Sequence, residues 1–139
     1  MSYAKMVSAL NTAYADASLG LTTLYEGDNQ ENPNSGTWAR ITHIPTGTKP
    51  SEPMSGGLDR FEGIMQIDVF APIETQRATL LGYIDTLRET LYQGARYTYS
   101  GQTVTIANSD PKPFRFERAL VNYALDVYWY AYKARPAAT

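Results

Sequence analysis

The stretch LVNYALDVYWYAYK, residues 120–133, predicts the last long strand of the fold. Its odd positions are apolar from Val121 to Trp129, and alternate side chains of a strand point to opposite faces of a sheet, so one face packs against a core. Its even positions are also mostly apolar or aromatic, interrupted only by Asn122 and Asp126. A strand that is apolar on both faces is normally covered on both. We therefore expect helices on one face and a partner molecule on the other.

Two amphipathic helices are predicted to cover the inner face. Residues 3–17 and 74–93 each carry apolar side chains at the spacing of one helical face. Ser2 and Gly20 mark the predicted ends of the first helix, and Gly94 stands where a glycine commonly ends a helix. The two stripes are Tyr3, Met6, Val7, Leu10 and Tyr14, then Leu80, Leu81, Ile84, Leu87 and Leu91.

The remaining segments predict further strands and two long loops. A long strand is expected over 58–70, and Ser100-Gly101 is a hairpin signal between two β-rich runs. The other strands are expected over 21–25, 38–44, 96–99, 102–106 and 114–116. Residues 26–37 and 45–57 are rich in Gly, Pro and polar side chains, which is typical of mobile loops. The sequence thus predicts one α+β domain over residues 1–139, with a mixed, mainly antiparallel sheet, two helices on one face and long flexible loops.

The composition of the 139 residues excludes several classes of function. The chain has no cysteine and one histidine, so it offers no disulfide, thiol nucleophile or multi-histidine metal centre. Its net charge is −2, so the chain lacks the excess of basic residues that is typical of a general nucleic-acid binder. No stretch approaches the ~20 apolar residues that cross a bilayer, and the first residues lack a signal peptide's pattern. We expect a soluble product of the cytoplasm that uses no membrane, metal or cofactor.

Candidate catalytic residues are few. His43 could form an acid–base couple with Glu62 or Asp68. Glu62, Asp68 and Asp126 could also share a face of the sheet, where two of them would form a carboxylate pair like that of a glycosidase. Single histidines and outward acidic side chains are commonly ordinary surface residues of strands, and none of the phosphate-loop, nucleophile-elbow or zinc-protease motifs occurs. An enzyme is therefore not expected.

A short basic and aromatic run suggests a weak alternative. Arginine and aromatic side chains together stack on single-stranded nucleic acid. The run comprises Lys112, Phe114, Arg115, Phe116 and Arg118. It is short, and the chain is acidic overall, so nucleic-acid binding is not expected as the main function.

The order of elements after residue 38 resembles a known family. The segment FEGIMQIDVFAP at 61–72 is followed directly by the leucine-rich helix, then by the hairpin with Gly101 and Val104, and last by the strand at 123–129. This pattern is similar to the tail terminator proteins of long-tailed, siphovirus-type bacteriophages. It covers about two-thirds of the chain, and the first helix agrees with it.

The resemblance implies a structural role in the virion. Members of the family form a six-fold ring that docks on the last ring of the tail tube, stops its growth and offers the opposite face to head-completion proteins. The implied partners are further copies of the chain, the tail tube protein and a head-completion or connector protein, with DNA passing through the ring without sequence-specific binding. The implied location is the neck of the tail. Another neck or head–tail joining component is the nearest alternative.

Aromatic residues are the candidate contacts between subunits. Tyrosine combines a large apolar ring with a polar tip, which suits a surface that is wet before assembly and dry afterwards. We expect interface anchors at Trp38, Tyr128, Tyr130 and Tyr132. The arm at 45–57 is expected to order on docking, with Lys49, Glu52 and Met54 as its contact residues.

Overall fold

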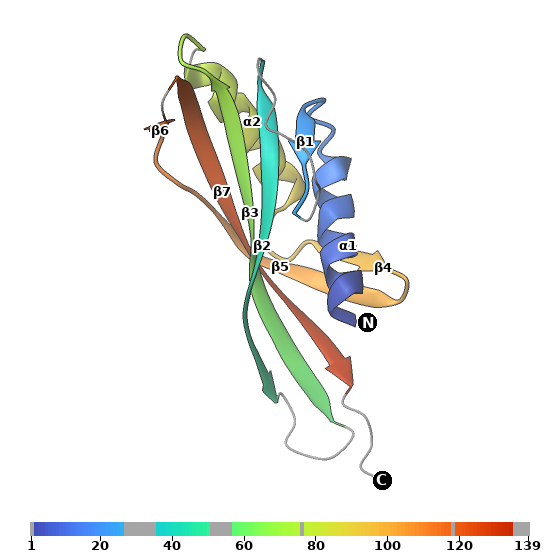
Figure 1. Ribbon diagram of the computed structural model, residues 1–139. Helices are drawn as coiled ribbons and strands as arrows, with labels where there is room; N and C mark the ends of the chain where they lie inside the picture. The colour runs from blue at the N-terminus through green and yellow to red at the C-terminus, as the bar shows by residue number, and fades with distance from the viewer. Residues whose placement is uncertain (1, 27–35, 51–56, 76, 118, 135–139) are drawn as a thin grey trace.

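The computed structural model describes residues 2–26, 36–50, 57–75, 77–117 and 119–134. Two helices and seven strands lie within these residues (Figure 1). In chain order they are α1 Ser2–Asp16, β1 Thr22–Leu24, β2 Trp38–Pro50, β3 Leu58–Pro72, α2 Arg77–Thr90, β4 Arg96–Tyr99, β5 Gln102–Pro111, β6 Arg115–Glu117 and β7 Leu120–Ala134. The predicted α+β class is confirmed.

All seven strands belong to one sheet. The order along it is β1-β2-β3-β7-β5-β4, and β6 pairs with β7 beside this path. β1 and β2 are parallel, whereas the other pairs are antiparallel. The long strands β3 and β7 are paired over their full length, from Leu58 opposite Ala134 to Pro72 opposite Leu120. The sheet is therefore mixed and mainly antiparallel, as predicted.

Both helices pack on one face of this sheet. α1 lies against β4 and β5, and α2 lies against β7 and β3. The odd positions of β7 from Val121 to Ala131 point to this face and are buried, as are the predicted helix positions Met6, Leu10, Leu80 and Ile84. Leu81 differs from the expectation because its side chain is exposed beside the stripe.

The hairpin between β4 and β5 forms at the predicted turn. Ser100 and Gly101 both have positive φ, at 48° and 84°, which is the conformation of a two-residue turn that matches the twist of antiparallel strands. Tyr99 pairs with Gln102 directly across it.

The strand β2 extends past the point where the sequence predicted a loop. Pro45 was expected to end the strand, but β2 continues to Pro50 after a register shift between Pro45 and Gly47. Among the described strands, β1 pairs with residues 38–40 of β2 and none pairs with this side of the rest of β2. An edge strand tolerates proline because the missing N–H removes no ladder bond there. The bulge absorbs the irregularity. The loop predicted over 45–57 is thus wrong for residues 45–50.

A second bulge lengthens β5 in the same way. The strand continues through a register shift between Ile106 and Asn108 as far as Pro111, whereas the sequence predicts that it ends at residue 106.

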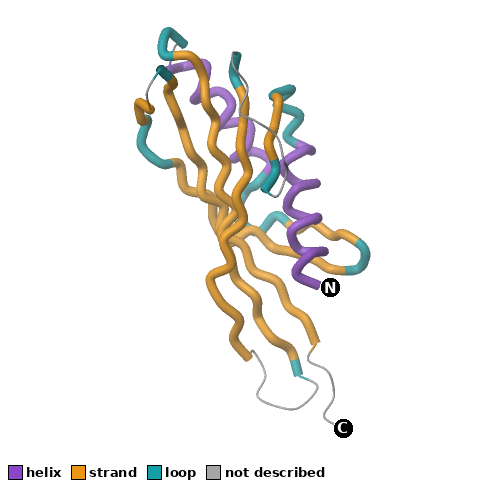
Figure 2. The backbone as a smooth tube through the Cα atoms, in the orientation of Figure 1, coloured by secondary structure: helices purple, strands orange, loops and turns teal. Residues whose placement is uncertain are grey.

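The long strands project as an arm beyond the helices. In the lower part of Figure 1, β2, β3 and β7 continue as three strands without a helix against them, and Figure 2 shows the same extension. The register places residues 47–50, 58–62 and 130–134 side by side there. We call these residues the arm.

Candidate interaction surface

The face of the sheet opposite the helices carries the even positions of β7. Asn122 and Ala124 are buried there, Tyr128 and Tyr130 are half-buried, and Tyr132 is 42% exposed. The partly exposed rings lie toward and within the arm, and their register partners on β3 are Ile64, Glu62 and Arg60 respectively. We call this the open face.

Arg60 organises the tyrosines of the arm. Its guanidinium carbon lies 4.2 Å from the centre of the Tyr130 ring and 5.9 Å from that of Tyr132. Nη1 donates to the Tyr132 hydroxyl at 3.1 Å, and Nε donates to Oε1 of Glu62 at 2.8 Å. The two tyrosine rings meet edge to face with centres 5.8 Å apart. We name Arg60, Glu62, Tyr130 and Tyr132 the arginine–tyrosine cluster.

The cluster has the chemistry of a protein interface. Tyrosine and arginine are enriched at interface hot spots, where a stacked guanidinium and a fixed ring lose little conformational freedom on binding. An apolar row continues it toward the middle of the sheet, where Ile44, Ile64 and Tyr128 lie on adjacent strands in register. Ile44 is exposed, and the other two are half-buried.

Trp38, the fourth predicted anchor, is buried, unlike the three tyrosines. Its ring stacks on Phe70 at 4.4 Å and packs with Leu24 and Leu120, so that only 2% of the residue is exposed. A partner can reach little of this side chain in the described conformation. Its burial supports a role in the fold rather than contact with a partner.

The predicted docking contacts fall largely outside the described structure. Lys49 is the second-last residue of β2, where it pairs with Arg60, and so it does not lie in a loop. Glu52 and Met54 lie outside the described residues.

A buried carboxylate lies further along the open face. Asp68 is almost fully buried, between Arg40 at 3.7 Å, Asn122 at 3.5 Å and Arg115 at 3.9 Å. Burial raises the pKa of its carboxyl, and the arginines and Asn122 offset only part of this effect. The carboxylate of Asp126 raises the pKa further.

The histidine does not meet a catalytic carboxylate. His43 is buried on the helix-covered face, and its Nε2 lies 2.9 Å from Oδ1 of Asn11 in α1. Glu62 and Asp68 are on the open face, because their register positions differ in parity from that of His43. The proposed acid–base couple is therefore wrong. Burial lowers the pKa of His43, and Glu26 opposes this shift.

The three carboxylates share a face, but each is held in an ion pair within the chain. Asp68 and Asp126 lie close enough to interact, but Glu62 is six residues further along β3 and binds Arg60. At about 3.3 Å per residue, that places Glu62 roughly 20 Å from Asp68.

The basic and aromatic run is largely occupied within the chain. Nζ of Lys112 lies 3.3 Å from Asp126, and this hydrogen bond raises the lysine's pKa. Arg115 donates to Asn122 at 2.9 Å. The Phe114 ring packs on Tyr123 of the core, and Arg118 lies outside the described residues. These contacts engage Lys112, Phe114 and Arg115 within the chain, whereas Phe116 remains 69% exposed.

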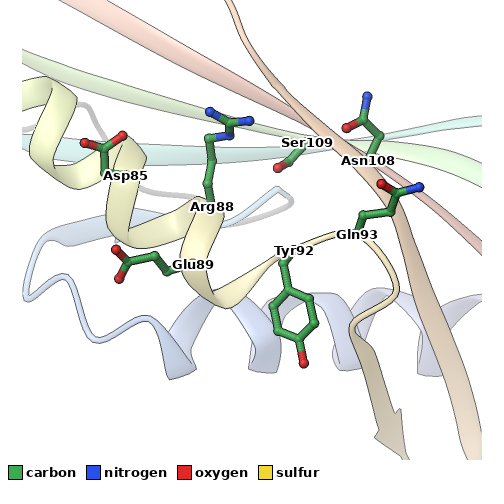
Figure 3. Close-up of a pocket in the computed structure, with 7 residues that line it drawn as sticks. All are labelled: Asp85, Arg88, Glu89, Tyr92, Gln93, Asn108 and Ser109. Carbon is green, nitrogen blue, oxygen red and sulfur yellow. The ribbon is translucent and has the colours of Figure 1, made fainter.

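A polar hollow of about 460 Å³ lies between the end of α2 and the bulge of β5 (Figure 3). Arg88 extends toward the strand that carries Ser109, whereas Glu89 and Tyr92 point away from it. The hollow lacks a histidine or a nucleophile paired with a base, so its residues resemble an ordinary solvated helix face.

Within the described part of the chain, no cluster of acidic or histidine side chains could hold a metal ion. Nor is any helix there long and apolar enough for a membrane span.

Solved structures share this arrangement of helices on one face of a curled sheet. One, known only by a sequence identifier, has a TM-score of 0.71 over 96% of this chain and 94% of its own, at 15% identity. Another is a chain from the virion of a native gene transfer agent particle, with a TM-score of 0.62, 14% identity, and coverage of 96% and 98%. No family model matches the sequence, and no curated protein matches it. At these identities, the likeness establishes a shared fold.

Sequence reasoning found the tyrosines but missed their partner. The sequence pattern places Arg60 and Ile64 only within the long strand predicted over 58–70. Arg60 lies beside Tyr132 because the strands at 58–70 and 120–133 pair in one particular register. That register depends on contacts between distant residues, which no local sequence pattern specifies.

Proposed function

We propose that this chain is a structural subunit of a bacteriophage virion, and more narrowly a tail terminator that forms a six-membered ring on the end of the tail tube. Support comes from the order of sequence elements after residue 38 and from the fold shared with a chain of a virion particle. The observation that carries the proposal is the open face of the arm, where Arg60 holds Tyr130 and Tyr132 in partial contact with solvent.

The physics of a ring suits such a surface. A cyclic assembly joins one patch of a subunit to a different patch of the next and closes at a fixed number. Burying a tyrosine of ~200 Å² contributes roughly 5 kcal/mol gross at ~25 cal/mol/Å², and association costs remove a large share of it. The same contacts repeated around a ring add to its stability.

Termination of the tube follows from the asymmetry of the ring. One face of the ring docks on the tube protein, and the other lacks the surface that a further tube ring needs, so growth stops. That second face binds a head-completion or connector protein. DNA passes through the lumen without sequence-specific contacts, and the chain acts without catalysis, cofactor or membrane. Its place is the neck of the virion tail.

The deciding experiment removes the gene from a phage that carries it. Electron microscopy of the resulting tails should show tubes of irregular, excessive length, and expression of the intact chain from a plasmid should restore a uniform length. Tails of normal length that join heads normally would contradict the proposal. Tails of normal length that fail to join heads would instead favour another neck or head–tail joining component.

A further inference from the structure

An apolar pocket of about 290 Å³ opens at the base of the arm. Tyr3 of α1, Pro45 and Thr48 of β2, Phe61 of β3 and Trp129 of β7 line it. It therefore lies on the helix-covered side of the sheet, where α1 begins and the arm leaves the core. None of the tyrosines of the arginine–tyrosine cluster lines it.

The wall of this pocket holds a buried donor without a partner. Trp129 is 3% exposed, and its Nε1 has no hydrogen-bond partner among the described residues. The indole lies over Gly63, with the edge that carries Nε1 closest to the glycine, and Pro45 is the next residue across the sheet. An N–H that has lost water without gaining an acceptor favours a guest that brings one.

The most exposed large apolar side chain described lies at the other end of the same sheet. Phe116 of β6 is 69% exposed. Its ring rests edge to face on Phe114 at 5.2 Å, and Phe114 in turn packs on Tyr123 of the core. Phe116 is thus a projecting ring with a fixed base rather than a loose side chain.

One molecule cannot bring these two features together. Phe116 pairs with Val121, which lies opposite Ala71, ten residues along β3 from Phe61. At about 3.3 Å per residue, this separation is about 33 Å. Figure 1 shows β6 and the arm toward opposite ends of the sheet. Two different complementary patches at opposite ends are the arrangement that a cyclic assembly requires.

We propose that the pocket at the base of the arm receives Phe116 of a second copy of this chain. Opposite charges accompany the two halves. Arg115, next to Phe116 in the chain, has a side chain that is 58% exposed, whereas Glu26 lies close enough to Tyr3 of the pocket that its charge, after burial, raises the pKa of the tyrosine hydroxyl. β6 pairs on one side only among the described strands, so its free edge supplies main-chain carbonyls for Nε1 of Trp129.

The inference rests on the ring proposed above and specifies how its subunits meet. Photo-cross-linking tests it directly. A benzophenone amino acid replaces Phe116, equal amounts of ¹⁵N-labelled and unlabelled chain are mixed at up to about 1 mM, and cross-linked peptides are mapped by mass spectrometry. We expect mixed-isotope cross-links to peptides that contain Tyr3, Thr48 or Phe61. The same probe at Tyr92, another exposed ring, should not reach them.

Sedimentation of matched variants provides the second readout. Phe116→Ala should weaken self-association about tenfold or more, whereas Tyr92→Ala should leave it unchanged. Thr48→Trp should weaken it as well, because the larger ring fills the pocket from an exposed position. A wild-type chain that remains monomeric throughout this concentration range, or cross-links that map elsewhere, would overturn the inference. Tail-length control could survive that result, so the proposed function would be judged separately.

Discussion

Gly63 shows how one residue shapes the base of the arm. The indole of Trp129 lies directly across from it, and a Cβ at this position would be 2.6 Å from Cζ2 of the ring. Real side chains do not approach so closely, and both the ring and the backbone are buried. The absence of a side chain at residue 63 therefore determines where the indole rests.

We expect Gly63→Ala to destabilise the protein by about 1–3 kcal/mol, since the added methyl forces the indole to move within a packed core. Urea unfolding measures the change. Gly82→Ala is the matched control, because Gly82 lies within α2 with open space around it and should gain up to about 1 kcal/mol from the better helix former. Equal stability of the Gly63 variant and the wild type would contradict this account of the packing.

Asp68 is a residue whose charge costs stability. Its folded pKa is raised above the ordinary value of 3.8, mainly by burial. Below pH 3.8 the carboxyl is protonated in both the folded and the unfolded state, so the cost is absent there. The cost grows as the pH rises from 3.8 to the folded pKa, and it is complete above that.

Asp68→Asn should therefore raise the melting temperature at pH 7, and the gain should shrink toward pH 4. The arginines left behind are half-exposed, so the loss of their ion pairs costs little. Calorimetric scans at several pH values check this prediction. A variant that is less stable at pH 7 would mean that the ion pairs outweigh burial.

At the scale of elements, one hydrogen-bonded side chain ties α1 to β2. His43 meets Asn11 of α1 through Nε2, and its main-chain N–H donates to Glu26 at 2.9 Å. Its Nδ1 is buried without a partner among the described groups. This environment suits a neutral ring, which is why burial lowers the pKa.

The stability contributed by this contact should be lost in mild acid. Because the folded pKa of His43 lies below the unfolded value of 6.5, the unfolded state binds the proton first, and stability falls as the pH drops from 6.5 toward the folded pKa. Urea midpoints should decline between pH 7.5 and 5.5. His43 is the sole histidine of the chain, so His43→Gln should flatten that decline. If the urea midpoints of His43→Gln declined with pH as steeply as those of the wild type, groups other than His43 would be responsible for the decline.

The arm is the element whose tyrosines we assign to assembly. Tyr132→Ser should change the free energy of unfolding by no more than about 1 kcal/mol, because the residue lies at the surface of the arm with 42% of its area exposed. We expect it to weaken self-association about tenfold, as seen by sedimentation velocity. Tyr99→Ser, at an equally exposed tyrosine on the edge strand β4, is the control and should assemble normally. If both variants changed self-association equally, the result would contradict the assignment of the arm to the interface.

At the scale of the whole molecule, the charges are balanced within the chain. The basic residues near β6 meet Asp68 and Asp126, and the net charge is −2. We expect no binding to single-stranded oligonucleotides above background, even at about 50 mM salt, where phosphate contacts are strongest. Fluorescence anisotropy measures this. Tight binding that weakens steeply with salt would instead support the nucleic-acid alternative.

The division of the fold into elements could be predicted almost completely from the sequence. Helical stripes, the Ser100-Gly101 turn and the two-sided strand at 120–133 are local patterns, and local patterns report the period of a helix or a strand. The sequence pattern is wrong at Pro45 and after residue 106, where each strand continues through a bulge. A bulge depends on the neighbouring strand, which a local pattern does not contain.

The candidate site was predictable only in part. Tyr130 and Tyr132 were identified because their strand is apolar on both faces, but their partner Arg60 was not. The prediction that Trp38 is an anchor rests on its aromatic character, and the structure buries it on Phe70.

By itself, the sequence determined the class of fold, the two helix faces and the existence of a sheet face that its own helices leave uncovered. The tertiary structure alone decided the register, and with it the stacking of Arg60 on the tyrosines, the separation of His43 from Asp68 and the position of Trp129 over Gly63. The physical reason is that alternation along a strand is set by each residue's own neighbours. Pairing across a sheet, in contrast, is set by contacts between residues that are far apart in the chain.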